Sequence, residues 1–445
     1  RKDSFLGQAD LPFAYGYCVV FPDCNYAGPM PPGADNAVVL TASDLEFLGR
    51  RIPDALKKWS RIDPPKPLTG TEFNGVVSAL SPSFNLIPVL FRRIEDQDER
   101  LFRMTEDQSR VLDYIQKHKR VAIEGVAGSG KTLLAKAQAQ RFARQGLRTL
   151  LLCYNKALAQ WLDSSVPEQF DGYITVKHFH GLCNEFCLKH GITFNVPAEN
   201  REVFWRAKAP ELFYDAIGLS TDRYDAVVID EGQDFLPNWW LPVEMLQKDE
   251  NGPFYLFFDP AQNLYAGEQF TIPDLGEPIC LPTNCRNTKK IAETCGRIGG
   301  FSIPVRDDAP TGDATVIEVA AAGNGQAALC EKIVQEWTGR GGLKPSQVAI
   351  LDPHNLHNSS LRGRKSMAGV NLTDNLDLWA DNKGILFSTI RSFKGLEADA
   401  IVILDVPVPG SLQYFNRSDL YVAASRAKHL LVVVALDERV KDFLT

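Results

Sequence analysis

The residues best suited to chemistry form a glycine-rich segment that ends in lysine and threonine. Residues 125–132 read Gly-Val-Ala-Gly-Ser-Gly-Lys-Thr, between the apolar run 121–123 and the helix-favouring run 133–137. Glycines allow backbone N–H groups to surround phosphate oxygens, and the start of a helix adds partial positive charge. Lys131 suits the β- and γ-phosphates of a nucleoside triphosphate, and the Thr132 hydroxyl suits Mg²⁺. The predicted ligands are Gly125, Gly128, Ser129, Gly130, Lys131 and Thr132.

A pair of acidic residues supplies the second chemical element. Asp230 and Glu231 directly follow the apolar run 226–229, and ligands bind outside the carboxyl ends of parallel strands. Asp230 would hold Mg²⁺, directly or through water, and Glu231 would activate the attacking water. Taken alone, the pair could equally be an exposed acidic turn. The phosphate-binding segment about a hundred residues earlier makes triphosphate hydrolysis the favoured interpretation.

Strands and helices must position these residues. Short apolar runs recur in the middle of the chain at 121–123, 149–152, 226–229 and 255–258. They recur in the last third at 314–317, 348–351, 385–387, 401–404 and 431–434. Strands that are buried on both faces of a parallel sheet are almost continuously apolar, and helices connect them. The pattern predicts an α/β fold with two consecutive α/β lobes.

The same pattern sets the expected domain limits. We expect a first lobe over residues 101–280, with a small insertion over about 183–222, and a second lobe over 281–445. Residues 1–100 contain candidate strands at 17–21 and 37–40 and predict a small α/β accessory domain.

Composition limits the classes of partner. The 445 residues are 44% hydrophobic and 23% charged, and no apolar run is long enough to span a bilayer. The net charge of −7 provides no general attraction for nucleic acid, so binding would need a local groove. The nine cysteines are scattered without paired zinc-type spacing, which predicts free thiols in a cytoplasmic protein with no membrane partner.

Eight segments occur in a characteristic order along residues 101–440. They are 104–108, 153–158, 175–180, 230–234, 259–262, 284–288, 389–397 and 421–427. Together with the P-loop, these segments resemble the motifs of superfamily 1 helicases of the Rep/UvrD-like type. The resemblance implies two tandem RecA-like lobes with parallel sheets, ATP and Mg²⁺ as cofactors, and single-stranded nucleic acid as partner.

The resemblance also implies roles around the nucleotide. Gln108 would read the adenine edge, Gln262 would sense the γ-phosphate, and Glu397 lies in the motif that bridges strand and nucleotide. Arg286 and Arg426 would act as arginine fingers from the second lobe. Guanidinium groups suit phosphate oxygens and stabilise charge on the transferred group. The site would be complete only when the lobes close, so hydrolysis would drive a relative motion of the lobes. For either arginine alone, a surface salt bridge is the competing interpretation.

The strand contacts rest on residues in or beside the motifs. Bases stack on aromatic rings, and strand phosphates pair with cationic and polar groups. The candidates are Tyr154, Asn155, Lys156, Phe179, His180, Tyr265, Arg391 and Phe393. Core packing is the alternative for each of them. Trp239 and Trp240 are as well explained by packing as by strand binding.

The sequence departs from the family pattern at several positions. Cys285 stands where an adenine-stacking aromatic is usual, and Leu133 stands where an arginine often flanks the base. Strict preference for ATP is therefore left open. Arg391 stands where histidine is usual. About a hundred residues separate Arg286 from Lys394, which leaves little room for a large accessory insertion and favours translocation over processive unwinding.

Residues 13–24 bear a second resemblance, to the late part of nuclease-related (NERD) domains. Those domains carry a metal-binding Asp and an E-x-K or Q-x-K earlier in the chain, and residues 1–12 do not supply this pattern. Either a catalytic part lies upstream, or the segment is a structural remnant.

The combined expectation is an ATP-driven single-stranded DNA translocase or helicase. Coupling to a partner protein or an upstream nuclease domain, in DNA repair or anti-phage defence, is a further expectation. The alternatives are an ATPase switch that responds to nucleic acid without unwinding, and an RNA motor of the same superfamily. The sequence carries no short signature that separates RNA from DNA.

Overall fold

The computed structural model describes residues 16–25, 30, 34–59, 69, 90–262 and 271–444, and of 107 and 108 only the backbone. The chain divides into two compact units, Arg1–Ile87 and Pro88–Thr445. Both expected lobes lie in the second unit, which begins earlier than the boundary expected near residue 100. Within the described part of the chain, no helix combines the length and the apolar character needed to cross a membrane.

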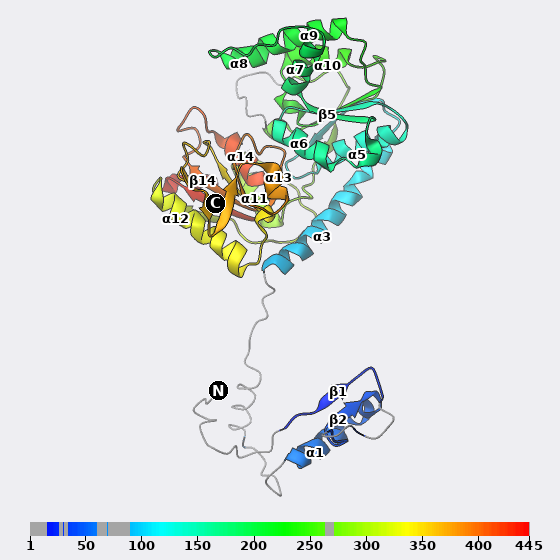
Figure 1. The fold of residues 1–445 in the computed structure, drawn as a ribbon, viewed down its shortest axis with the longest axis vertical. Coiled ribbons are helices and arrows are strands. Elements are labelled where there is room, and N and C mark those ends of the chain that lie inside the picture. The colour runs from blue at the N-terminus through cyan, green and yellow to red at the C-terminus, as the bar shows by residue number, and fades with distance from the viewer. Residues whose placement is uncertain are drawn as a thin grey trace. The chain divides into compact units, whose positions relative to one another are not determined.

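The first unit contains a short parallel pair of strands, β1 (Val19–Phe21) and β2 (Val39–Thr41). A 3₁₀ turn, η1 (Ala42–Phe47), and the helix α1 (Leu48–Trp59) follow (Figure 1). The carboxylate of Asp44 accepts a hydrogen bond from the Thr41 backbone N–H at 2.9 Å and fixes the start of η1. Among the described residues of this unit, no cluster of metal-binding side chains is found. Residues 13–15 of the segment that resembles nuclease-related domains lie outside the described residues, and the resemblance stays a prediction.

The first lobe is built on a six-stranded parallel sheet in the order β5-β4-β6-β7-β3-β8. Its strands are β3 (Arg120–Gly125), β4 (Thr149–Cys153), β5 (Ile174–His178), β6 (Ala226–Ile229), β7 (Phe254–Phe258) and β8 (Ile279–Leu281). The central strands β4, β6 and β7 are buried along their whole length. All four runs predicted as strands in this lobe form strands, whereas β5 and β8 at the two edges were not predicted.

Helices cover both faces of this sheet. They are α4 (Val111–Ile115), α5 (Lys131–Arg144), α6 (Lys156–Ser165), α7 (Phe179–Lys189), α8 (Arg201–Val203), α9 (Ala209–Leu219) and α10 (Pro237–Met245). Helices α7, α9 and α10 pack together at one end of the lobe, and α8 lies beside them (Figure 1). A π-helical turn, η3 (Phe204–Lys208), connects α8 to α9. The helical region between β5 and β6 occupies the place of the expected insertion.

The second lobe contains a seven-stranded sheet in the order β11-β12-β13-β10-β14-β15-β9. Its strands are β9 (Val316–Val319), β10 (Val348–Asp352), β11 (Ser366–Met367), β12 (Val370–Thr373), β13 (Ile385–Thr389), β14 (Ala398–Val406) and β15 (Ala427–Ala435). All its pairings are parallel except that of β11 with β12. Its main helices are α11 (Lys289–Gly299), α12 (Asn324–Gln335), α13 (Leu376–Ala380) and α14 (Arg417–Ser425). The two sheets confirm the predicted α/β fold with tandem RecA-like lobes.

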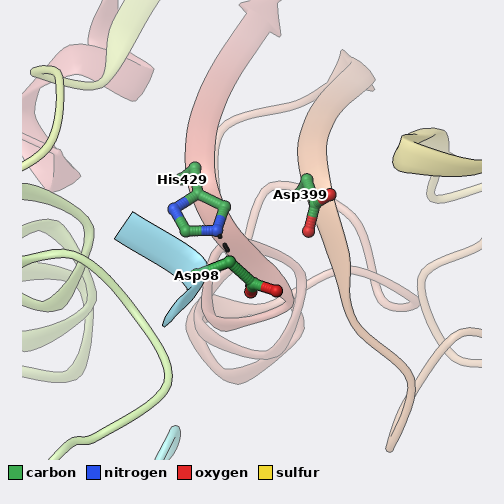
Figure 2. A group of neighbouring side chains, drawn as sticks. All are labelled: Asp98, Asp399 and His429. Atoms are coloured by element: carbon green, nitrogen blue, oxygen red, sulfur yellow. Dashed lines mark hydrogen bonds and ion pairs between the residues drawn. The ribbon is translucent and has the colours of Figure 1, made fainter. Parts of the chain in front are cut away.

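The long helix α3 (Leu90–Ser109) connects the two lobes. Ile94 is 1% exposed in the core of the second lobe, and Met104 packs beside Cys285. Asp98 of α3 lies close to Asp399 of β14 and His429 of β15 (Figure 2). Lys428 donates from Nζ to Asp98 at 2.8 Å and lies 2.5 Å from Asp399, so a cation already compensates both carboxylates. The contacts of Lys428 and His429 with Asp98 attach α3 to β15.

Candidate functional site

The glycine-rich segment forms a tight loop between β3 and α5. Gly128 and Gly130 adopt φ angles of 72° and 83°, in the left-handed region that favours glycine. A Cβ at Gly128 would lie 2.1 Å from the Oδ1 of Asn287, so the loop packs directly on the second lobe. The Nζ of Lys131 donates to the carbonyl oxygens of Gly125 and Val126 at 2.8 and 3.0 Å. The ammonium thus lies inside the loop, where phosphate oxygens would take over these contacts.

Two buried polar groups at this loop lack hydrogen-bond partners. They are the hydroxyl of Ser129 and both carboxylate oxygens of Asp230. Burial and the neighbouring Glu231 raise the pKa of Asp230, and Thr132 and Lys131 oppose the rise only in part. A buried carboxylate without a partner is unfavourable unless a cation compensates it. Asp230 and Thr132 therefore fit a divalent cation, and Ser129 fits a phosphate oxygen.

Glu231 lies at the carboxyl end of β6 in a strained backbone conformation. Its φ of 55° is unusual for a residue other than glycine, and such strain concentrates at functional sites. Burial opposes ionisation of Glu231, but Lys394, Arg426 and Lys131 together hold its pKa below the usual value. Gln233 donates from Nε2 to the Glu231 carboxylate. Glu231 is thus kept as an oriented carboxylate that can accept a proton.

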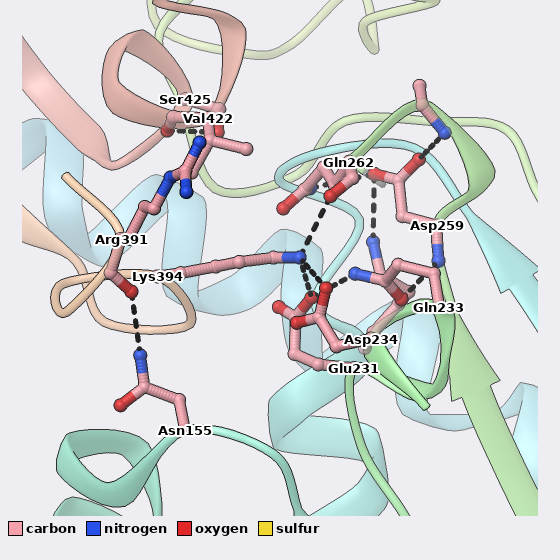
Figure 3. Close-up of polar contacts among 12 residues, drawn as sticks. Asn155, Glu231, Gln233, Asp234, Asp259, Gln262, Arg391, Lys394, Val422 and Ser425 are labelled. Atoms are coloured by element: carbon pink, nitrogen blue, oxygen red, sulfur yellow. Dashed lines mark hydrogen bonds and ion pairs between the residues drawn. The ribbon is translucent and has the colours of Figure 1, made fainter. Parts of the chain in front are cut away.

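Lys394 of the second lobe reaches into the acidic cluster of the first (Figure 3). Its Nζ donates to Asp234 Oδ1 at 2.6 Å and to the Gln262 carbonyl at 2.8 Å, and it lies 3.9 Å from Glu231 Oε2. Lys394 is only 3% exposed. Even so, burial raises the pKa of Asp234 to about 6. This ion pair joins the lobes next to the candidate base.

A second polar chain crosses between the lobes at the phosphate loop. Arg426 Nη2 donates to Gln262 Oε1 at 2.8 Å, and Gln262 Nε2 donates to Asp259 Oδ2 at 2.7 Å. The same Asp259 oxygen lies 3.4 Å from Lys131 Nζ. Arg426 is therefore directed at the phosphate loop from the facing lobe.

Arg286 is directed within its own lobe. It donates from Nε and Nη2 to Glu397 Oε2 at 3.0 and 2.5 Å. Both side chains are partly exposed to the cleft, at 17% and 24%. Arg286 would have to leave Glu397 to contact a γ-phosphate.

One cavity of about 200 Å³ brings these predicted residues together. Its lining includes Gly128, Gly130, Lys131, Thr132, Glu231, Gln262, Arg286, Glu397 and Arg426. Its volume is below the roughly 300–1,000 Å³ of typical ligand pockets. In this arrangement of the lobes the cavity is small for a nucleotide.

Sequence reasoning did not single out five other residues of this lining: Trp161, Trp379, Gly395, Leu396 and Lys428. The two tryptophans lie outside the motifs and carry no short-range signal. Cys285 is 2% exposed and packs with Leu101 and Met104 rather than lining the cavity. The side chain of Gln108 lies outside the described residues, so its expected contact with adenine stays a prediction.

A second cavity, of about 680 Å³, lies beside the acidic cluster and is called the aromatic groove. Its lining includes the predicted strand contacts Tyr154, Asn155, Lys156, His180 and Arg391. Further lining residues are Trp205, Arg206, Asp234, Trp239 and Lys394. Asn155 donates from Nδ2 to the carbonyl oxygens of Arg391 and Ser392, both at 3.0 Å, and so joins the lobes here (Figure 3 draws the first of these bonds).

The structure does not bring every predicted strand contact into this groove. Phe179 and Phe393 are both 0% exposed. Phe179 stacks on Trp239 with ring centroids 4.3 Å apart, and Phe393 lies beside Trp379. Both phenylalanines are core residues, so we withdraw the expectation of direct strand contact for them. Tyr265 lies outside the described residues. Trp239 underlies the groove at 2% exposure, whereas Trp240 packs on Phe235 away from its lining.

Comparison with known proteins adds a match in the second lobe. No curated protein sequence matches the chain. Among solved structures, the chain is similar to one described as the structure of PRRSV helicase, with 13% identity, a TM-score of 0.36, and coverage of 72% of this chain and 53% of that one. It is also similar to a complex of Arterivirus nonstructural protein 10 (helicase) with DNA, with 13% identity, a TM-score of 0.35, and coverage of 77% and 65%. The chain thus matches about half to two thirds of those two chains. Residues 384–434 match the UvrD-like helicase C-terminal domain, and this segment supplies Lys394, Glu397 and Arg426 to the cleft.

Proposed function

We propose that the protein is an ATP-driven motor that moves along single-stranded nucleic acid. The main support is the pair of polar connections across the cleft, from Arg426 to Gln262 and from Lys394 to Asp234. The first connection lies in the lining of the cleft cavity and the second in that of the aromatic groove. A change of conformation at one cavity is therefore expected to alter the conformation of the other.

The proposed hydrolysis uses residues of both lobes. Lys131 and the backbone of the phosphate loop would hold the β- and γ-phosphates, and Thr132 and Asp230 would hold Mg²⁺, which neutralises phosphate charge. Glu231 would accept the proton of the attacking water. Arg426 would leave Gln262 and contact a γ-phosphate oxygen. Arg286 would likewise leave Glu397 and contact a γ-phosphate oxygen. Fixed guanidinium groups at that point stabilise charge in the transition state.

Motion would follow from the closure of the cleft. A nucleotide needs more room than the present cavity offers, so its entry separates the lobes and its contacts with the arginines close them again. The aromatic groove changes shape with the same motion, because Asn155 and Lys394 connect the lobes along its wall. A strand held by both lobes would then be advanced with each cycle.

The proposal is tested by the rate of ATP hydrolysis with and without single-stranded DNA or RNA. Strong stimulation by one of the two polymers is expected. Glu231→Gln is expected to lower the rate of ATP hydrolysis by roughly a hundredfold or more. Nucleotide binding is expected to persist, because the substitution removes only the proton acceptor. Glu293→Gln removes an exposed carboxylate on α11 and serves as the matched control.

Two results would contradict the motor. Hydrolysis that is slow and indifferent to both polymers would indicate an ATPase switch of another kind. Full turnover in Glu231→Gln would remove Glu231 from the mechanism. Displacement of a bound protein from the strand, measured with the parent, separates stepping from mere binding.

A further inference from the structure

The aromatic groove has a wall that comes from outside all the helicase-like segments. The π-helical turn η3, between α8 and α9, contributes Trp205 and Arg206 to the lining. Single π-helical turns are uncommon and are frequent at functional sites. The turn belongs to the helical region between β5 and β6, which also supplies His180 to the groove.

The backbone of η3 is held in place against the groove by side chains of two other helices. His180 of α7 makes a hydrogen bond from Nε2 to the Trp205 carbonyl at 3.0 Å. Trp239 and Asn238 of α10 donate to the Arg206 carbonyl at 3.1 and 3.0 Å. Successive carbonyls of one short turn are therefore fixed from two directions. This fixation presents Trp205 to the groove at a defined position.

His180 is suited to this role because it stays neutral. Burial lowers its pKa to about 4, so the ring carries one N–H near neutral pH, and the contact with the Trp205 carbonyl places that N–H on Nε2. The ring centroids of His180 and Trp205 lie 4.8 Å apart. The corner formed by His180 and Trp205 is thus aromatic and uncharged, whereas Glu202 and Arg206 supply charged groups elsewhere in the lining.

The surroundings of Trp205 leave part of its ring open. Phe194 and Phe204 contact the indole, with centroids 5.8 and 5.3 Å away. Trp205 nevertheless remains half-buried and lines the groove. Tyr154 also contacts His180, with ring centroids 5.8 Å apart. Tyr154 and Trp205 therefore both contact His180 in a groove whose lining also includes the cationic side chains of Lys156 and Arg391.

We propose that Trp205 is a base-stacking residue that holds an unpaired nucleobase of the single strand in the aromatic groove, an inference that rests on the proposed motor function. A partly exposed indole, a neutral histidine beside it and nearby cations match the general needs of an unpaired strand, which are a stacking surface and phosphate partners. Because every base has a π-face, this contact does not select sequence. It also does not involve the 2′-hydroxyl, so it serves DNA and RNA alike.

The test measures binding of oligo-dT and oligo-U to the parent and to Trp205→Ala. The loss of one base–aromatic stack is expected to weaken binding by roughly 5-fold to 150-fold. Trp205→Phe retains an aromatic ring and is expected to recover most of the affinity. Tyr214→Ala, which removes an exposed aromatic residue of α9 outside the groove lining, is the matched control and is expected to bind like the parent.

A scan of the strand tests the contact without altering the fold. A single abasic position is moved along the oligonucleotide. At one position, the missing base is expected to weaken binding to the parent protein but not to Trp205→Ala. Such non-additivity identifies two groups that contact each other. The stacking role is excluded if the losses of binding free energy caused by the abasic position and by Trp205→Ala add at every register. It is also excluded if Trp205→Ala binds like the parent. In both cases the motor proposal stands. If the parent binds neither oligonucleotide, the motor proposal itself fails.

Discussion

At the scale of single residues, Lys394 is a buried cation that connects the two lobes in the cleft. Its ammonium is buried, and it joins the second lobe to Asp234 beside the candidate base Glu231. The same side chain contributes to the lining of the aromatic groove. Lys394 is therefore the residue through which occupancy of the groove would most directly change the environment of Glu231.

Lys394→Met is expected to reduce stimulation of hydrolysis by a strand and to destabilise the fold. Without Lys394, Asp234 either stays charged without compensation, which costs about 3–5 kcal/mol in comparable buried pairs, or takes up a proton, which its raised pKa favours; the loss of stability is therefore at most of that size. The double variant Lys394→Met/Asp234→Asn removes that charge as well and should regain much of the stability. The measurements are denaturant unfolding and ATPase rates with and without strand. Coupling through Lys394 is excluded if the stable double variant responds to the strand like the parent.

At the scale of elements, the phosphate loop shows a close approach between the lobes. Gly128 and Gly146 have similar φ angles of 72° and 79°. A Cβ at Gly146 would meet nothing within 4 Å, whereas one at Gly128 would lie within 2.3 Å of both Asn287 and Asn284. The two glycines therefore separate the effect of backbone strain from the effect of contact with the second lobe.

Gly146→Ala is expected to lower the free energy of unfolding by about 1–2 kcal/mol, because alanine is strained in the left-handed conformation. Nucleotide binding is expected to stay intact. Gly128→Ala adds a clash with the second lobe and is expected to destabilise the protein further and to weaken nucleotide binding at least tenfold. Thermal unfolding and titration with a non-hydrolysable ATP analogue provide the two measurements. Equal behaviour of the two variants would mean that the close packing of Gly128 is not needed.

The sequence predicted the central strands better than the edges of the sheets. Strands β4, β6 and β7 are buried throughout and appear as continuous apolar runs. β5 ends in Lys177 and His178 at the edge of its sheet, where one side is not covered by a neighbouring strand, so its pattern is mixed. Helix α3 is strongly charged, and its packing on the second lobe depends on a few residues such as Ile94 and Met104. Local patterns could not place the domain boundary before it.

The candidate site was predicted where chemistry requires fixed residue types and missed where geometry decides. The phosphate loop, Asp230 and Glu231 could be recognised because phosphate and Mg²⁺ accept few alternatives. Trp205 and Trp161 lie outside the motif segments, and only the packing of their helical turns brings them to the cavities. Phe179 lies within a motif but points into the core, because motif position does not fix the side on which a residue lies.

At the scale of the whole molecule, buried carboxyl groups in the second lobe connect stability to pH. Asp352 at the end of β10 is 0% exposed and accepts hydrogen bonds from Ser359 Oγ at 2.7 Å and from the His354 backbone N–H at 2.7 Å. Asp405, at a φ of 52° in the irregular end of β14, shares the Ser359 hydroxyl at 3.4 Å. Burial, aided by Asp405, raises the pKa of Asp352 to about 8. The folded protein therefore holds a proton there that the unfolded chain releases near pH 4.

The sign of the effect follows from this difference. Between about pH 4 and pH 8 the folded state binds more protons than the unfolded state, so stability contributed by Asp352 falls as pH rises, by at most about 1.4 kcal/mol per pH unit. Asp352→Asn is expected to flatten the decline in unfolding free energy between pH 5 and pH 8, measured by urea unfolding. Asp437→Asn is the control, because Arg439 lowers the pKa of Asp437 to about 2 and its titration lies outside this range. Since Asp352 lies in the second lobe, away from the linings of both cavities, the flattening should appear without ATP or strand. A parent-like slope in Asp352→Asn would show that other groups set the pH dependence of the whole molecule.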